Sequence, residues 1–142
     1  MVSKNTLITD SWDSVYTYIQ TTNPISTNNI FSAWNDTLAT TKGYPIVILS
    51  VPRINWEKLN LNGKFTACEV NIPCQVYNLS AETVKSQTDE VIAKLHAGRD
   101  TFASAGFTNM NFEGMDYDAW TEGKKKIHRI GFDITFNYKE NA

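Results

Sequence analysis

Four carboxylates gather in the segment EGMDYDAWTEG. They are Glu113, Asp116, Asp118 and Glu122. Such a group could form a calcium loop or supply a pair of catalytic acids. A calcium loop that begins at Asp116 would need a ligand oxygen, a glycine and a glutamate where Trp120, Thr121 and Ile127 stand. The spacing therefore favours a solvated hairpin connection and predicts no metal site.

The two histidines, His96 and His128, are the only imidazoles available for general acid–base catalysis. His96 lies in a helical pattern, and His128 shares the strand parity of Ile130, so both fit structural roles. The chain has no GxSxG motif and no glycine-rich phosphate loop. We therefore expect no enzymatic activity and no cofactor. The alternative that stays open is a small ligand-binding protein or enzyme whose pocket is lined by Asp116, Asp118 and His128.

The two cysteines, Cys68 and Cys74, fall in a segment whose polarity alternates from residue to residue. This spacing places them on one face of a strand but about 20 Å apart, so they cannot bond to each other. The chain has no CxxC motif and no histidine cluster, so the sequence predicts no metal site at these thiols. We expect two buried, apolar side chains, as suits a reducing cytosol.

A run of three lysines, Lys124, Lys125 and Lys126, lies close to Arg129 and could contact phosphate groups of DNA. The whole chain has a net charge of −2, from 13 Lys and Arg against 15 Asp and Glu, so any contact with nucleic acid must be local. The alternative interpretation of the run is a solvated turn that discourages aggregation at a sheet edge.

A second group of contact candidates follows Pro52 in the stretch RINWEKLNLNGK. The apolar residues Trp56, Leu59 and Leu61 could anchor another protein, with Arg53 at the rim. We expect this stretch to be an exposed loop. The alternative is that the same side chains fold back and form a satellite cluster on their own domain.

The size and composition predict a single folded domain over residues 1–142. A chain of 142 residues, 42 % hydrophobic, can bury roughly 70 % of the surface that its unfolded form exposes. The first residues contain no long apolar segment, and no stretch approaches the roughly 20 apolar residues of a membrane span. We therefore expect a soluble protein that is neither exported nor bound to a membrane.

The hydrophobic periodicity predicts an α+β fold with a mainly antiparallel sheet, an N-terminal helix and one long helix packed on the sheet. The expected helices are Thr9 to Gln20 and a long helix from Ser80 to Gly106; the expected strands are Ile30 to Trp34, Tyr44 to Val51, Lys64 to Tyr77, Phe107 to Met115 and Ile127 to Tyr138. The continuous apolar run in Tyr44 to Val51 favours the centre of the sheet.

The strand Lys64 to Tyr77 is long for a domain of this size. Fully extended it spans about 46 Å, whereas a compact domain of this length has a diameter of roughly 37 Å. Pro73 cannot donate a ladder hydrogen bond and marks a bulge, a bend or an edge. The strand must either bend or project as part of a hairpin, and a projecting ribbon would pair with a second chain.

The order of these elements, and several phrases within them, resemble a family of viral proteins. The phrases are IFSAW, GYPIVILSV, CEVNIPCQVYN, SAETVKSQTDEVIAKL and KIHRIGFDITFNY. Together with the N-terminal amphipathic helix they are similar to tail-terminator or tail-completion proteins of long-tailed bacteriophages, and the likeness spans nearly the whole chain.

The resemblance implies a virion structural protein of the head-to-tail junction, assembled in the host cytoplasm. Such a protomer forms a ring, commonly a hexamer, on the last ring of the tail tube, where it stops tube growth. Its partners are other copies of itself, the tail tube protein and the head-to-tail connector or stopper protein. DNA passes through the lumen, so Lys124, Lys125 and Lys126 are lumen candidates by charge. The nearest alternative is another neck component, a head-completion or stopper protein.

Overall fold

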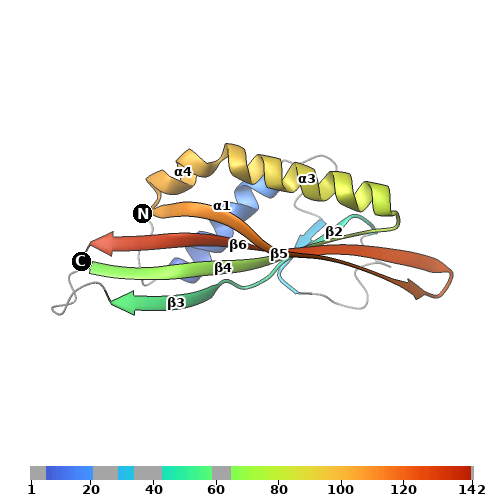
Figure 1. The fold of residues 1–142 in the computed structure, drawn as a ribbon, viewed down its shortest axis with the longest axis horizontal. Helices are drawn as coiled ribbons and strands as arrows, with labels where there is room; N and C mark the ends of the chain where they lie inside the picture. The colour runs from blue at the N-terminus through green and yellow to red at the C-terminus, as the bar shows by residue number, and fades with distance from the viewer. Residues whose placement is uncertain (1–5, 21–28, 34–42, 59–64, 142) are drawn as a thin grey trace.

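The computed structural model describes residues 6–20, 29–33, 43–58 and 65–141. The elements in chain order are α1 (Leu7–Ile19), β1 (Ile30–Phe31), β2 (Ile46–Leu49), β3 (Arg53–Lys58), β4 (Phe65–Asn78), α3 (Ala81–Ala97), α4 (Arg99–Ser104), β5 (Phe107–Glu122) and β6 (Lys125–Asn141). Helices and a mostly antiparallel sheet make up the fold (Figure 1), which confirms the predicted α+β class.

Within the described residues, the sheet has six strands in the order β1-β2-β4-β6-β5, and β3 also pairs with β4. All of these pairings are antiparallel except that of β1 with β2. The central strand is therefore β4, and the prediction that Tyr44 to Val51 forms the centre is wrong. The four residues of β2 are buried, as their apolar run suggested, because side chains cover both faces of the sheet there.

Pro73 explains why β2 and β3 are separate strands along the same side of β4. The backbone N–H of Ser50 donates to the carbonyl oxygen of Pro73 at 2.9 Å. Pro73 has no N–H group to donate to the carbonyl oxygen of Ser50, so the ladder of hydrogen bonds between β2 and β4 ends at this pair. Beyond Pro52 the chain pairs with β4 again, from Arg53 opposite Asn71 onward. The sequence predicted a bulge, a bend or an edge at Pro73; the structure instead places Pro73 within the central strand, at the gap between its two partners β2 and β3.

Alternating side chains of β4 give the sheet two unlike faces. The helix side carries the buried residues Cys68, Val70, Ile72, Cys74 and Val76, and both long helices pack against it with Val15, Ile19, Val84, Val91 and Leu95. The open side carries Glu69, Asn71, Pro73 and Gln75, together with a smaller apolar cluster around Ile46, Ile48, Tyr77 and Ile127. The predicted alternation of β4 is confirmed, and so is the inward parity of β6 from His128 to Tyr138.

The beginning of α3 and its break from α4 lie at Ser80 and Gly98. Ser80 caps α3, since its hydroxyl accepts the N–H of Thr83 at 3.1 Å. The predicted long helix is interrupted at Gly98, which separates α3 from α4. A Cβ atom at Gly98 would lie 2.6 Å from the ring of Tyr18, so α1 packs where only glycine fits. No helix in the described part of the chain is long and apolar enough to cross a membrane.

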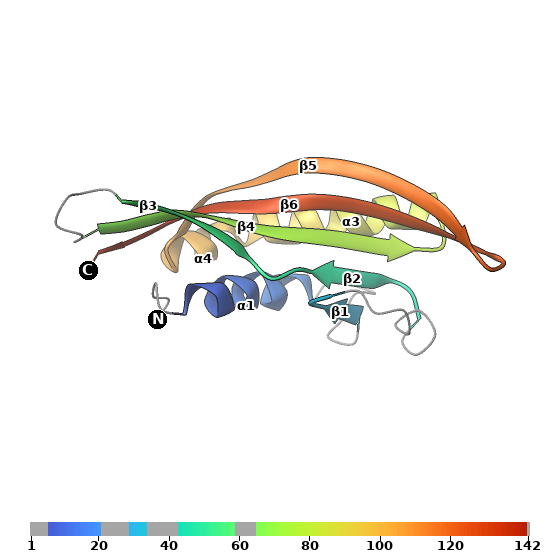
Figure 2. The same cartoon turned by 90° about the horizontal axis from the view of Figure 1, so that it is seen from below.

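The last two strands form a long, bowed hairpin (Figure 2). Two bulges bend β5, one at Asn109 and one at Gly114, and both residues have positive φ. The strand continues to Glu122 and turns at Gly123, so the segment predicted as a hairpin connection is itself β-strand. The last pair between β4 and β6 is Asn78 with His128, and the hairpin tip projects beyond it (Figure 1).

Candidate functional site

Arg53 and Trp56 lie on β3, so the prediction of an exposed loop is wrong. They stand opposite Asn71 and Cys68 of β4, which places Arg53 on the open side and Trp56 on the helix side. A two-residue alternation of Ile54 and Trp56 is too short a signal to identify a strand without its partner. Leu59 and Leu61 lie outside the described residues.

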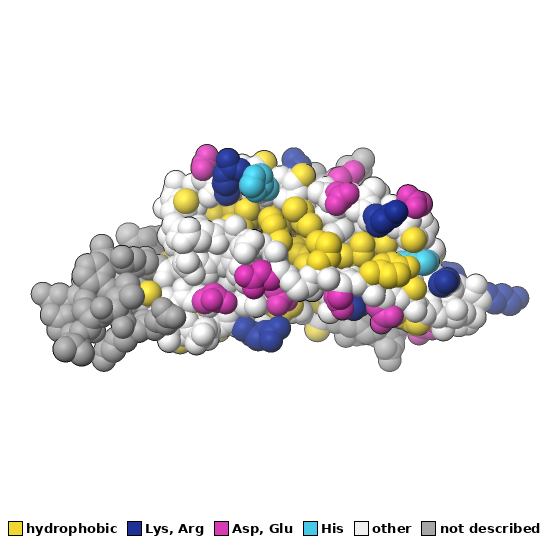
Figure 3. Space-filling view, viewed as in Figure 1, with side chains coloured by type: hydrophobic (Ala, Val, Ile, Leu, Met, Phe, Trp, Pro, Cys, Tyr) yellow, Lys and Arg dark blue, Asp and Glu magenta, His cyan; other side chains and the backbone are white. Residues whose placement is uncertain are grey.

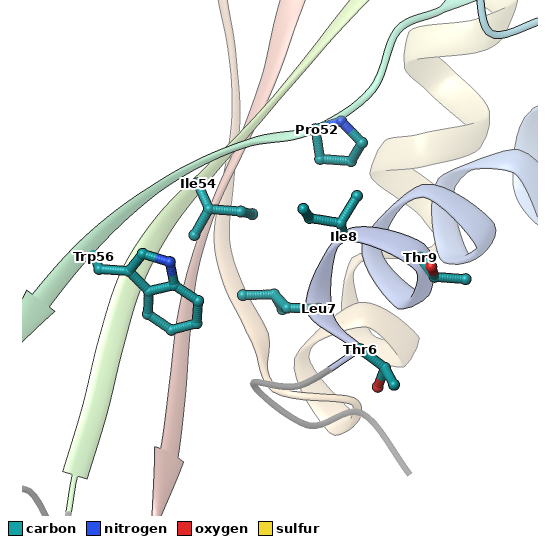
Figure 4. A pocket seen from close by; sticks show the side chains of 7 residues that line it. All are labelled: Thr6, Leu7, Ile8, Thr9, Pro52, Ile54 and Trp56. Atoms are coloured by element: carbon teal, nitrogen blue, oxygen red, sulfur yellow. The ribbon is translucent and has the colours of Figure 1, made fainter.

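Trp56 borders a cavity of about 620 Å³ between α1 and β3. The lining residues are Thr6, Leu7, Ile8, Thr9, Pro52, Ile54 and Trp56, and Figure 4 shows the apolar ones facing one another across the space. Trp56 is 48 % exposed and Ile8 is 50 % exposed. Large apolar side chains thus remain open to contact here. The alternative of a satellite cluster also involves Leu59 and Leu61, which lie outside the described residues.

Pro73 lies on the open side of β4, opposite Asp133 of β6. Arg53 shares this side of the sheet, but Trp56 does not. The residues predicted to contact a partner thus divide between the two faces of the sheet and do not form one patch.

Lys124, Lys125 and Lys126 are exposed at the tip of the β5–β6 hairpin, at the opposite end of the molecule from β3 (Figures 1 and 2). Arg129, expected to join them, is instead paired with Asp116, with Nη2 2.8 Å from Oδ2. The lysines therefore form a small basic tip without Arg129.

The carboxylate and imidazole candidates for a ligand pocket lie on different faces. Asp116 and Asp118 oppose Gly131 and Arg129 and point to the open side. His128 is buried on the helix side, where its Nδ1 lies 2.5 Å from the hydroxyl oxygen of Tyr117. The three residues do not line one pocket. His96 is exposed on α3, with Nε2 2.6 Å from Nη1 of Arg99.

A second apolar hollow, which the sequence did not indicate, lies between α3 and β5. Its volume is about 510 Å³, and Ala81, Lys85, Met115, Asp116, Tyr117 and Ile130 line it. Met115 is 56 % exposed and Tyr117 is 54 % exposed. Figure 3 shows apolar side chains in a band along α3. The sequence pattern did not predict this surface, because the bulge at Gly114 breaks the alternation of apolar and polar residues along β5.

The thiols have the environment expected of core residues. Burial raises the pKa of Cys68 to about 11 and that of Cys74 to about 12, because the apolar surroundings disfavour the thiolate. Neither thiol is in a disulfide. Within residues 6–20, 29–33, 43–58 and 65–141, no three His, Cys, Asp or Glu side chains gather closely enough to hold a metal ion.

Comparison with known proteins yields no match to a protein-family model and none to a curated protein sequence.

Proposed function

We propose that this chain is a tail-terminator protein, which forms a ring at the end of a bacteriophage tail tube, stops tube growth and joins the tail to the head. One observation carries the proposal. Among the described strands, β1, β3 and β5 each lack a partner on their outer side, and β3 and β5 also have large exposed apolar side chains, Trp56 on β3 and Met115 and Tyr117 on β5. The β3 and β5 edges differ in length and in the side chains that they carry.

Two unlike contact surfaces on one protomer favour head-to-tail association. Such a contact is heterologous, and it closes into a ring when each copy is rotated about a common axis. A sheet edge with an unpaired backbone is also a template for pairing with another chain. The resemblance to tail terminators supplies the expected ring of about six copies.

In this proposal the protein acts by binding its neighbours and covering the end of the tube, without catalysis or a cofactor. One face of the ring covers the last ring of tail tube protein, and the other meets the connector or stopper protein of the head. The basic hairpin tips, with Lys124, Lys125 and Lys126, line the passage for DNA. The ring is part of the virion and assembles in the host cytoplasm.

The test is to disrupt the gene in its virus and to image the particles by electron microscopy. A terminator limits tube growth, so we expect tails of uncontrolled length and heads that lack tails. A second virus stock, complemented with the intact gene, serves as the control. Tails of normal length beside heads that have lost their DNA would contradict the proposal and indicate the other neck component, a head-completion or stopper protein.

A ligand-binding role is tested separately on the purified chain. The account predicts an unchanged melting temperature after addition of divalent ions or nucleotides, because Asp116 and Asp118 point away from His128. A saturable rise in melting temperature would favour the alternative of a small α+β ligand-binding protein or enzyme.

A further inference from the structure

We propose that the outer edge of β3 in one copy pairs with the outer edge of β5 in the next copy, so that the sheet continues from subunit to subunit. This inference rests on the ring proposed above and names its interface. The contact segments are Arg53–Lys58 on one side and the part of β5 from Glu113 to the hairpin tip on the other.

The hydrogen-bond pattern identifies the backbone groups that face outward. The bond from Ser50 to Pro73 shows that odd-numbered residues of β4 direct their backbone groups toward β2 and β3. Asn71 and Glu69 therefore bond Arg53 and Asn55, which leaves the N–H and C=O groups of Ile54 and Trp56 directed outward.

The outward-facing backbone groups of β5 are identified in the same way. Even-numbered residues of β6 bond β4, so its odd-numbered residues Arg129 and Gly131 bond Asp118 and Asp116 of β5. The backbone of Ala119 is left on the outer edge. Its N–H donates to the carboxylate of its own neighbour Asp118, at 2.8 Å, which is consistent with a donor that the ladder does not use.

Strand direction fits a closed ring. The pairs β3 with β4, β4 with β6 and β6 with β5 are all antiparallel, so β3 and β5 run in opposite directions. Rotation about an axis along the strands preserves both the direction of each strand and the side that each face points to. The edges of neighbouring copies therefore meet antiparallel, helix side with helix side.

On the helix side, the two edges are apolar. Ile54 and Trp56 of one copy would enter the hollow beside Met115 and Tyr117 of the next, and these residues would in turn cover the cavity between α1 and β3. Side chains directly opposite on antiparallel strands lie about 5 Å apart at Cβ, close enough for each pair to exclude water. Each hollow is thus filled by the neighbouring subunit.

On the open side, the outer part of β5 is acidic, and β3 has an exposed arginine that could pair with it. Arg53 is exposed on β3, whereas Glu113, Asp116 and Asp118 line the outer part of β5. Asp116 already pairs with Arg129, which leaves Glu113 and Asp118 to meet the arginine. If β5 of one copy paired with β5 of another, acidic side chains would face acidic side chains. The charge pattern therefore favours pairing of β5 with β3.

The pairing requires a displacement along the strands. Trp56 is level with Cys68 and Tyr138, near the beginning of β5, whereas Tyr117 is level with Ile130 and Val76. Sheets that close on themselves have strands tilted by about 40° and a staggered register. A stagger in this direction moves the neighbouring β3 toward the hairpin tip, and the cysteine pair that cross-links shows how far.

The interface can be tested by cross-linking paired cysteines. Asn55→Cys is combined with Asp118→Cys or with Glu113→Cys, since all three side chains are exposed on the open side. Mild oxidation should give a ladder of covalent multimers from at least one of these proteins. The matched control, Asn55→Cys with Glu90→Cys on the exposed surface of α3, should give several-fold less. Rings in which neither pair exceeds the control would overturn the inference.

A backbone variant gives an independent test. Proline is tolerated at an edge position whose N–H faces outward, so Ala119→Pro should keep the melting temperature and circular dichroism of the parent. The Ala119→Pro protein should no longer self-associate, because β3 of the neighbouring copy bonds the N–H group that proline lacks. The Ala119→Val protein keeps this N–H group and should still self-associate. Normal assembly of folded Ala119→Pro protein would overturn the inference. Cross-linked rings that fail to bind the tail tube would instead overturn the proposed function and leave this interface standing.

Discussion

Arg129 and Asp116 form an ion pair across the β5–β6 hairpin, with Nη2 of the arginine 2.8 Å from Oδ2 of the aspartate. The pair passes over Gly131, the register partner of Asp116. A Cβ atom built on this glycine would collide with the guanidinium group and lie 2.9 Å from Oδ1 of Asp116. The glycine therefore makes room for the pair that joins β5 to β6 within the projecting hairpin.

The change Gly131→Ala should break the Arg129–Asp116 pair and destabilise the chain by at most about 1 kcal/mol, because the added methyl group displaces the ends of two flexible, partly exposed side chains. Urea denaturation measures the loss. In an Arg129→Ala background the same substitution should cost less, since its main collision is gone. An equal cost in both backgrounds would show that the two residues are not coupled.

The change Trp56→Ala should weaken self-association and leave the monomer nearly as stable as before, because the side chain is 48 % exposed. Sedimentation at several concentrations measures association, and thermal melting measures stability. Trp12→Phe is the matched control. It removes the 2.7 Å bond from Nε1 to the carbonyl oxygen of Leu49 and should cost about 1 kcal/mol of stability without affecting the interface. The reverse pattern would remove Trp56 from the contact surface.

The stability of the chain should fall in alkaline solution. Burial raises the pKa of Cys74 from its usual 9.0 to about 12, so the folded chain keeps a proton that the unfolded chain releases. The stabilisation that the protonated Cys74 thiol gives the folded chain is complete below pH 9 and is lost as the pH rises toward 12. Urea midpoints at roughly pH 8 and roughly pH 10 measure this fall. The urea midpoint of Cys74→Ala should fall less between these two pH values. If it falls by the same amount as that of the parent chain, other groups cause the loss of stability.

Reversing the charge of Lys124, Lys125 and Lys126 to glutamate should leave ring assembly intact, because the hairpin tip lies beyond the pairing segment of β5. The same change should reduce DNA retention in particles, since the tip would then repel phosphate groups. Replacement of the three lysines by arginine is the matched control and should retain DNA. Normal DNA retention in the glutamate variant would exclude these lysines from the lumen.

Much of the fold was predictable because local patterns and tertiary structure agree. The alternation from Cys68 to Val76 identified β4 and its buried face, and Ser80 before an apolar stripe identified the beginning of α3. In both segments the side chains that define the pattern are also those that pack in the core.

Other features depend on partners distant in the sequence. The strand β3 forms because β4 continues past Pro73 and offers an unpaired length of ladder. The need for a small residue at Gly98 depends on the ring of Tyr18 from α1. The outer part of β5 is exposed on both faces, so its composition resembles that of a loop, and the bulge at Gly114 breaks its alternation. The hollow beside Met115 and Tyr117 follows from that bulge.

Ring formation is the central claim, and mass photometry of the purified chain over a concentration series tests it most directly. The chain is measured alone and after addition of the tail tube protein from the same virus, with negative-stain images of both samples. We predict a closed species of about six subunits with a central hole, alone or on tube ends. A strict monomer in both samples, with bare tube ends, would contradict the account.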